Sequence, residues 1–590
     1  MRTLLFILVI AGTTLALGKD FSVAAQASSS NPKLDEWNHL VDEYFRAYFE
    51  FNPSAGTYAG FHQYDDKLED YSRQSIDRET AAAHNFLSRF EAFDAKPLGL
   101  EVQQDRELVI NSLKGTLLEL ENIRGWEKNP DRYSSGITQS AFLIMSRRFA
   151  SADQRLRSLI AREKQMPAVF TAARANLKNP PKIYTEVAVE QVPGLVSFFQ
   201  NDVPQAFKDV KDQKLQAEFK QTNDAVIEAL KSYETFLKQD VLPKSNGDYR
   251  IGSDNYKKKL AYDEMVDIPL DHLLQMGRED LQRNQEHFRK VAAEIDPHKT
   301  PQQILNELEK DHPSGDHLLQ AFRDTLVGLR GYIEQHHIVT IPSQVLPIVQ
   351  ETPPFARALT SASMDTPGPF EKVAKEAFFN VTLPDPSWPK DKTEEWLEGF
   401  NRGTIISTAV HEVYPGHYTQ FLWVPRAPSK VRKLIGAGSN AEGWAHYTEQ
   451  MMLDEGYGRT PGVPEEKDVK FLKLRLGQLQ DALLRDARFI CGISMHTGDM
   501  TLDQCTQFFI KEGYQTPAVA EREAKRGTSD PTYLVYTLGK LQIMKLRDDY
   551  KQLKGGSFTL QDFHDTFLKQ GFPPVKIIRR TMLGNDSPVL

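Results

Sequence analysis

The first half of the chain is a nearly unbroken series of helical patterns. From Lys33 to about His337, apolar residues recur at three- and four-residue spacing between short breaks, which predicts amphipathic helices. The first is expected to run from Leu34 to Phe51, where Asn52-Pro53 ends it. Further helices are expected at about 74–94, 101–123, 138–178, 203–239, 267–293 and 315–336. These helical patterns together predict a mainly α fold. No fixed repeat period is present, which disfavours a solenoid.

A short region of different period follows this helical tract. Runs of β-branched and aromatic residues between prolines predict a small β-sheet within residues 338–385, with strands near 339–341, 345–349 and 377–383. Such a sheet either lends an edge strand to an extended peptide or packs with its edge covered. Helical patterns then resume. We therefore expect an N-terminal helical region, 28–337, and a C-terminal region, 338–590, with helices at 400–455 and 465–585.

The N-terminal residues are typical of a secretory signal peptide. Arg2 precedes an apolar run from Leu4 to Leu17, and small residues follow at 24–27. We expect residues 1–27 to be a signal peptide and the protein to be secreted or periplasmic. The run is shorter than the ~20 residues of a membrane span, although an N-terminal anchor helix remains the alternative. No Cys follows the run, which excludes a lipid-modified N-terminal cysteine.

The charge and cysteine content exclude some partners and leave other questions open. A net charge of -8 and the lack of a basic stripe argue against nucleic acid, and no stable membrane span is expected after signal removal. Cys491 and Cys505 are the two cysteines. Cys491 lies in an apolar helical run, which favours a buried free thiol over a disulfide, and neither cysteine is expected to be catalytic. The oligomeric state is left open.

Two histidines six residues apart carry the strongest chemical signal. They stand in the string His411-Glu412-Val413-Tyr414-Pro415-Gly416-His417. On a straight helix six residues advance by about 600°, so the imidazoles would point about 120° apart and lie about 9 Å apart along the axis. Pro415 and Gly416 predict that the helix breaks between them, because proline lacks an N–H and glycine accepts unusual backbone angles. The break would let His417 turn back toward His411.

A carboxylate 25 residues after His417 completes a metal-ligand set. Glu442 lies near the start of a predicted helix that runs to about Leu453. We expect His411, His417 and Glu442 to hold one Zn²⁺ ion and to leave a fourth position for water. Glu412 points about 100° away from His411 and is the expected general base. Alternatively, Ser439-x-x-Glu442 is a capping box that only satisfies the start of the helix.

Further polar residues are candidates for supporting roles. Glu449 and His446 share a helical face with Glu442; Glu449 is expected to orient a ligand imidazole, and His446 is a substitute ligand or substrate contact. Downstream, Tyr536 and His496 are the candidate catalytic donors to an oxyanion, and Arg488 is a candidate for substrate binding. For each of these residues, packing between helices is the alternative role.

The two central motifs resemble a known family. His411 to Tyr418, with Glu442-Gly443-Trp444-Ala445-x-Tyr447-x-Glu449, is similar to the bacterial domain-of-unknown-function 885 family, usually described as secreted or lipoprotein metallopeptidases. The segments Tyr249–Gly252 and Thr352–Phe355 also resemble family landmarks. This resemblance implies a mostly helical, zincin-like body with a Glu-liganded zinc ion in a central cleft. From the sequence pattern we expect the small sheet to lie beside the metal-binding helix and residues 338–590 to form the catalytic region.

The chain departs from the family pattern at two places near the expected site. Gly492 stands where the family pattern has Asp, and Asp530-Pro531-Thr532-Tyr533 replaces a Pro-Gly-Gln-Ala string before Tyr536. The metal set is unaffected, but substrate preference is not carried over.

The residues together predict a zinc metallopeptidase that hydrolyses short peptides. In this prediction Glu412 takes a proton from zinc-bound water, which attacks the peptide carbonyl. Two alternatives are a metal-dependent hydrolase of another amide or ester and a non-catalytic zinc- or peptide-binding protein. A serine nucleophile is disfavoured because no G-x-S-x-G string is present. The motifs are compatible with both exopeptidase and oligopeptidase activity.

Overall fold

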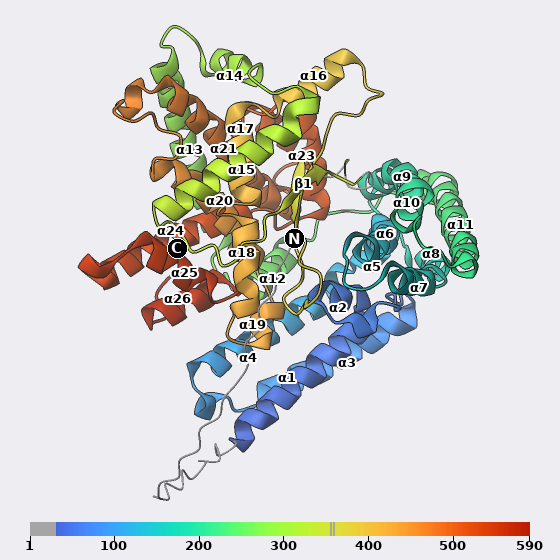
Figure 1. Ribbon diagram of the computed structural model, residues 1–590. Helices are drawn as coiled ribbons and strands as arrows, with labels where there is room; N and C mark the ends of the chain where they lie inside the picture. Colours follow the sequence, from blue (N-terminus) through green and yellow to red (C-terminus); the bar gives the residue numbers. More distant parts are fainter. Residues whose placement is uncertain (1–30, 354–356, 358–359) are drawn as a thin grey trace, which may run out of the picture.

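The structure is a computed structural model that describes residues 31–353, 357 and 360–590 (Figure 1). The expected signal peptide, 1–27, and the landmark residues Pro354-Phe355 lie outside these described residues. The described chain is mainly helical with one small sheet, as the sequence predicts.

The N-terminal helices form an elongated group, drawn in blue in Figure 1. Asn31 caps the first helix, and Asn52-Pro53 ends it as predicted. The side chains of Trp37, Phe45 and Phe90 lie in a core that also takes in Ile577 from near the C-terminus. The two ends of the described chain are therefore packed together. The helices are α1 (Pro32–Phe51), α2 (Pro53–Ala59), α3 (Arg73–Ala92) and α4 (Leu100–Leu117).

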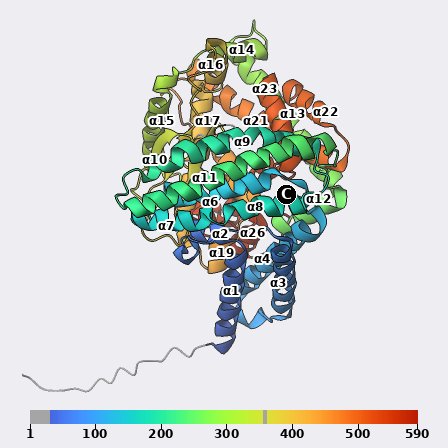
Figure 2. The same ribbon diagram turned by 90° about the vertical axis from the view of Figure 1, so that its right-hand side faces the viewer.

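A second group of helices has its own core. Its buried residues run from Leu68 to Val241 and also include Ala374. Helices α9 and α11 lie side by side across the face seen in Figure 2. The stretch predicted as one helix over 138–178 is three helices, because it breaks near Arg147 and again at Gln165, with a capping box at Ser151. The helices are α5 (Gly125–Lys128), α6 (Asp131–Ser146), α7 (Ala152–Glu163), α8 (Met166–Asn176), α9 (Lys182–Ser197), α10 (Val203–Phe207) and α11 (Gln213–Phe236).

The remaining helices include those that carry the two motifs. Helix α13 packs along α21, α15 packs on α17, and α20 packs along α24. The helices are α12 (Ser253–Asp263), α13 (Leu270–Ile295), α14 (Pro301–Glu309), α15 (Gly315–Gln335), α16 (Lys390–Glu398), α17 (Arg402–Glu412), α18 (His417–Trp423), α19 (Lys430–Leu434), α20 (Gly438–Asp454), α21 (Val469–Thr497), α22 (Leu502–Lys511), α23 (Pro517–Ser529), α24 (Val535–Lys554), α25 (Leu560–Leu568) and α26 (Val575–Leu583).

Short 3-10 or π-helical turns extend or connect these helices. Three of them are π-helical continuations of α4, α9 and α11. The turns are η1 (His62–Tyr64), η2 (Lys96–Leu98), η3 (Leu118–Ile123), η4 (Phe198–Asp202), η5 (Leu237–Val241), η6 (Leu242–Lys244), η8 (Val424–Arg426), η9 (Glu465–Lys467) and η10 (Gly555–Ser557). Among the described residues, no helix is both long and apolar enough to cross a membrane.

The small sheet lies against the helix that carries His411. Its strands β1 (Ile348–Glu351), β2 (Ala362–Asp365) and β3 (Phe378–Val381) are ordered β1-β3-β2, with β1 parallel and β2 antiparallel to β3. The strand predicted at 339–341 is wrong, since that segment has no regular structure, and β2 was not predicted. Arg323 of α15 donates to the carbonyl of Val349 and so covers part of the outer edge of β1. Helix α17 contacts β2.

Candidate metal centre

A break between α17 and α18 brings the two motif histidines together, as predicted. Helix α17 is capped by Asn401 and ends at Glu412, and α18 begins at His417. The N–H of Gly416 donates to the carbonyl of Val410 at 2.9 Å, so the chain folds back under the end of α17. A Cβ at Gly416 would lie 1.9 Å from the carbonyl oxygen of His411, which leaves room only for glycine.

Three side chains converge on one point beside this break. Glu442 Oε2 lies 3.4 Å from His411 Nε2 and 3.3 Å from His417 Nε2. Ligand atoms of these three residues all lie within 4.8 Å of one another. Glu442 Oε2 is buried yet hydrogen-bonds to no described residue. A tetrahedral zinc site with bonds of ~2.0–2.2 Å separates its ligand atoms by about 3.3–3.6 Å, so these residues fit such an ion. No other group of this kind occurs in the described ranges.

Helix α20 carries Glu442 in its second turn. The helix begins at Gly438, one residue after an Ala437 cap that makes no side-chain bond, and Ser439 Oγ has no described partner. The capping-box alternative is therefore wrong. Instead, the carboxylate of Glu264, from the end of α12, accepts the N–H groups of Gly438 and Ser439 at 3.1 and 2.8 Å. This leaves the carboxylate of Glu442 free to face the histidines.

Two glycines let α20 and α24 approach closely next to the site. A Cβ at Gly443 would lie 2.4 Å from the Cα of Gly539, and a Cβ at Gly539 would lie 1.8 Å from the carbonyl oxygen of Ser439. Only glycine permits these backbone contacts. The close approach places Tyr536, at the start of α24, beside the candidate ligand set.

A buried carboxylate orients the first histidine. Glu449 Oε1 accepts from His411 Nδ1 at 2.6 Å, while its other oxygen lies 3.2 Å from His446 Nδ1. Arg485 of α21 pairs with the same carboxylate at 3.1 Å. Burial opposes the charged form of Glu449, but Arg485 and the two histidines outweigh it and hold its pKa well below the ordinary value. His411 thus presents Nε2 to the shared point, which is the support that Glu449 was predicted to give.

The charged groups of the site hold one another in their ionised forms. Burial would lower the pKa of His411, yet Glu442 and Glu449 raise it to about 9. Burial would likewise raise the pKa of Glu442, but the imidazoles, His417 first, hold it well below its ordinary range. Glu412 differs: burial dominates and raises its pKa, although both histidines pull it down. The carboxylate of Glu412 makes no hydrogen bond or ion pair with any described residue, so it is available.

The structure separates the two candidate oxyanion donors. The ring of Tyr536 lies 6.1 Å from that of His411, nearly parallel to it, and the charge of Glu442 helps burial to raise the pKa of Tyr536. His496 instead packs between backbone groups: Nε2 donates to the carbonyl of Gly527 at 2.8 Å, and Nδ1 accepts from Ile251 N–H at 3.4 Å. We therefore keep Tyr536 as a candidate and interpret His496 as a packing residue.

The remaining predicted residues lie behind the site. Arg488 pairs with Glu523 at 2.7 and 3.0 Å, and its guanidinium lies 4.9 Å from the ring centre of Tyr536. Burial opposes ionisation of Glu523, but Arg488 overcomes it and lowers the pKa to about 2. His446 Nε2 has no described partner, and burial lowers its pKa to about 4. Arg488 and His446 thus support neighbouring groups and do not join the ligand set.

The sequence assigned no specific role to three residues around the site. Glu264 caps α20 from 175 positions away, and no local signal could identify it. Arg485 pairs with Glu449 and also with Asp481, four residues earlier on α21, at 3.2 Å. That i,i+4 pair is a readable pattern on a helix but does not show what lies opposite. Arg526 was not singled out, yet its Nη2 lies 3.3 Å from Tyr536 Oη.

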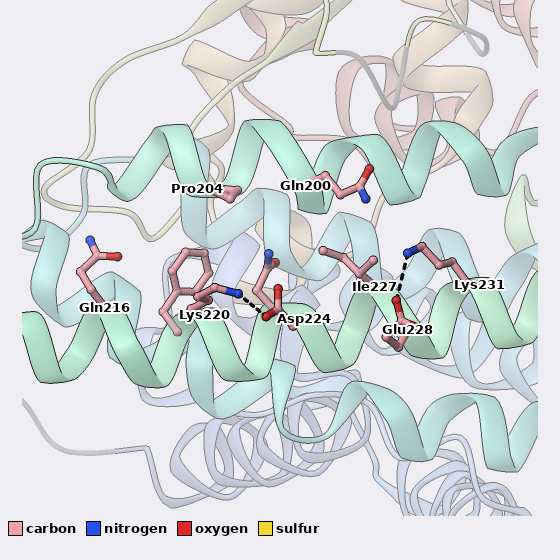
Figure 3. A pocket seen from close by; sticks show the side chains of 10 residues that line it. Gln200, Pro204, Gln216, Lys220, Asp224, Ile227, Glu228 and Lys231 are labelled. Atoms are coloured by element: carbon pink, nitrogen blue, oxygen red, sulfur yellow. Dashed lines mark hydrogen bonds and ion pairs between the residues drawn. The ribbon is translucent and has the colours of Figure 1, made fainter.

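The two cysteines and a surface hollow lie apart from the ligand set. Cys491 and Cys505 are buried free thiols, as favoured from the sequence for Cys491. A hollow of about 710 Å³ lies along α11 in the second helical group (Figure 3). Its charged side chains pair with one another, Lys220 with Asp224 at 2.5 Å and Lys231 with Glu228 at 2.9 Å. These charges are therefore already compensated within α11.

Comparisons with known proteins show a family and two related folds. The model of the family described as "Bacterial protein of unknown function (DUF885)" matches residues 53–582. A "putative lipoprotein of unknown function" from Shewanella oneidensis has 28% identity and a TM-score of 0.75, over 93% of this chain and 99% of that one. A "putative lipoprotein" from Colwellia psychrerythraea has 16% identity and a TM-score of 0.77, over 94% and 99%. No curated protein matches the chain.

Proposed function

The chain belongs to the bacterial DUF885 family, and from the geometry of its ligand set we propose that it is a zinc-dependent peptidase. One observation carries the proposal: His411, His417 and Glu442 converge on a single point. Two imidazoles and one carboxylate are a ligand set used by catalytic zinc sites, which keep one position open. Glu412, a carboxylate without a partner, lies next to this set in the chain.

The exposure of the ligands fits a site that a substrate can reach. The side chain of Glu442 is 30% exposed and that of His417 is 12% exposed, whereas Glu449 behind His411 is fully buried. The ligand set is therefore partly open to solvent at Glu442 and His417, while the buried Glu449 closes it behind His411. We extend the proposal to a zincin-like arrangement with the metal in a cleft and short peptides as substrates.

The chemistry divides between the ion and the protein. When bound, zinc polarises a carbonyl oxygen and makes water acidic near neutral pH. Glu412 accepts the proton of the attacking water and returns it to the leaving amine as the peptide bond breaks. Burial raises the pKa of Glu412, which makes it a stronger base than an exposed carboxylate. Tyr536 donates a hydrogen bond to the oxygen that becomes negative, and Glu449 keeps His411 oriented.

We also propose that the protein is exported. The N-terminal pattern of a charged residue, a short apolar run and small residues supports a signal peptide. The descriptions of the two structural relatives as lipoproteins agree with a location outside the cytoplasm. Peptides in that compartment are then the substrates within reach.

The test compares wild type with Glu412→Gln, and with Glu395→Gln as a control on the exposed face of α16. Zinc content is measured by mass spectrometry of the metal, and hydrolysis by product analysis of a peptide library. We expect all three proteins to bind one zinc ion. Turnover should fall by about 10²–10⁴-fold in Glu412→Gln alone, the contribution of a general base.

Other outcomes point to other functions. Hydrolysis of esters or non-peptide amides, without peptide cleavage, would indicate the first alternative enzyme. Zinc binding with no hydrolysis in the wild type would indicate a binding protein. Equal turnover in wild type and Glu412→Gln would remove Glu412 from the mechanism, and a protein that binds no zinc would refute the proposal.

A further inference from the structure

We propose that Arg526 binds a carboxylate of the substrate beside the metal centre, and that this carboxylate is the C-terminus of a short peptide. The inference rests on the proposed peptidase function and specifies its substrate: the enzyme would remove one or two residues from the C-terminal end.

Three guanidinium groups surround the ring of Tyr536. Those of Arg488, Arg485 and Arg526 lie 4.9, 5.9 and 5.9 Å from the ring centre. Tyr536 in turn lies next to His411. The surroundings of the proposed oxyanion donor are therefore rich in cationic groups, and an anionic part of a substrate would be attracted there.

Two of these cations are already committed to buried partners. Arg485, 11% exposed, pairs with the fully buried Glu449. Arg488, 8% exposed, makes two hydrogen bonds to the carboxylate of Glu523, which is 7% exposed. Breaking a buried ion pair leaves an uncompensated charge and is strongly destabilising, so neither arginine can turn toward a substrate.

Arg526 is the cation that a substrate can reach. Its side chain is 39% exposed, and its ion-pair partner Asp530, four residues on, is 40% exposed. Exposed ion pairs of this kind contribute little to stability, so another carboxylate can take the place of Asp530 at little cost. The guanidinium offers a planar set of donors that matches a carboxylate. Arg526 also donates to Tyr536 Oη at 3.3 Å, which fixes it next to the reacting groups.

The distance from Arg526 to the reacting oxygen limits the length of the leaving group. With Tyr536 Oη about 2.8 Å from the oxyanion, Arg526 Nη2 lies within about 6 Å of it, because the Arg526–Tyr536 contact is 3.3 Å. A charge-assisted bond adds about 3 Å. A carboxylate on Arg526 is then at most about 9 Å from the oxyanion. One residue spans about 3.3–3.6 Å, so the carboxylate belongs to the first or second residue after the cleaved bond.

The experiment measures peptide binding to zinc-loaded Glu412→Gln protein, in which turnover does not interfere. The first pair of probes is acetyl-trialanine with a free C-terminal carboxylate and the same peptide as a C-terminal amide. The second pair is an acetyl-tripeptide amide that ends in Glu or in Gln. It separates a C-terminal carboxylate from an acidic side chain. Affinities are measured by calorimetry.

The variants isolate Arg526 from general charge and folding effects. Arg526→Gln removes the guanidinium, and Arg522→Gln removes an equal charge from an exposed position one turn earlier on α23. Asp530→Asn removes the competing carboxylate and keeps Arg526. It tests the inference even if Arg526→Gln fails to fold, and melting temperatures report on folding.

We expect the free carboxylate to bind about 10- to 100-fold more tightly than the amide, the range of a charge-assisted hydrogen bond. Arg526→Gln should reduce this preference to within about threefold, Arg522→Gln should keep it, and Asp530→Asn should increase it. Equal affinity of the first probe pair, or a preference that survives Arg526→Gln, would overturn the inference. A preference confined to the Glu peptide would overturn the C-terminal assignment.

Failure of the proposed function gives a different result. If the wild type cleaves no peptide while the carboxylate preference depends on Arg526, the peptidase is refuted and the carboxylate site stands. If peptides are cleaved without any carboxylate preference, the peptidase stands and the role of Arg526 is refuted.

Discussion

The charge of Glu449 can be removed while its shape is kept. In Glu449→Gln, the amide oxygen can still accept from His411 Nδ1, where the carboxylate contact is 2.6 Å, but the negative charge is lost. The same change takes away the ion-pair partner of Arg485 and weakens the contact with His446. We expect weaker zinc binding and a less stable protein, for two separable reasons.

The size of each effect follows from the contacts. Partners that orient metal-binding histidines contribute about 10- to 100-fold in metal affinity, which is about 1.4–2.8 kcal/mol. Breaking a buried ion pair costs about 3–5 kcal/mol. Arg485 keeps Asp481 as a second partner at 3.2 Å, so we expect the lower end, about 3 kcal/mol.

Zinc affinity is measured by competition with a chelator, and stability by urea unfolding of the zinc-free protein. Glu455→Gln, at the exposed end of α20, is the matched control and should change neither quantity. If Glu449→Gln bound zinc as tightly as the wild type, then Glu449 would not orient His411. If its zinc-free form were equally stable, the Arg485 pair would not contribute to the fold.

Two further predictions concern backbone space and pH. A Cβ in Gly416→Ala would lie 1.9 Å from the carbonyl of His411, so we expect a loss of at least about 1–3 kcal/mol and a lower zinc content by metal analysis. Gly331→Ala on α15, where a Cβ meets nothing within 4 Å, is the control; equal zinc content in both variants would contradict the argument. Burial raises the pKa of Glu163 from its ordinary value of 4.5 to about 8, despite a bond from Thr222. Between these two pKa values the folded protein keeps a proton that the unfolded chain loses. The neutral carboxyl group therefore contributes to the free energy of unfolding fully below pH 4.5, and this contribution is lost as the pH rises through 8. Glu163→Gln, which mimics the neutral acid, should gain up to about 4 kcal/mol on the wild type between pH 5 and 8 in urea unfolding; parallel pH profiles would contradict it.

Local rules were enough to predict the core of the candidate site. The separation of His411 and His417 is too large for one straight helix, and Pro415-Gly416 supplies the break that the structure contains. Backbone geometry at proline and glycine depends on the residues themselves, so it can be read without knowledge of the fold. Glu442 was predictable as a partner because it lies on a helix soon after the motif.

The roles of the two candidate oxyanion donors could not be distinguished from the sequence, because they depend on how the helices pack. Tyr536 and His496 both lie on apolar helices, yet only Tyr536 reaches the ligand set, because Gly443 and Gly539 let α24 approach α20. The two nitrogens of His496 bond to backbone groups instead. Short strands were uncertain for a related reason: β2 exists because β3 pairs with it, and its own residues carry little signal.

The amino-acid sequence by itself determined the helical class of the fold, the break at Pro415-Gly416 and the identity of the three candidate ligands, since each depends on residues close along the chain. Tertiary structure alone decided that Glu264 caps α20 and that Arg526, rather than Arg488, is open to solvent. Those outcomes depend on which distant carboxylate is packed against each group, and burial and pairing of charges are set by contacts between helices.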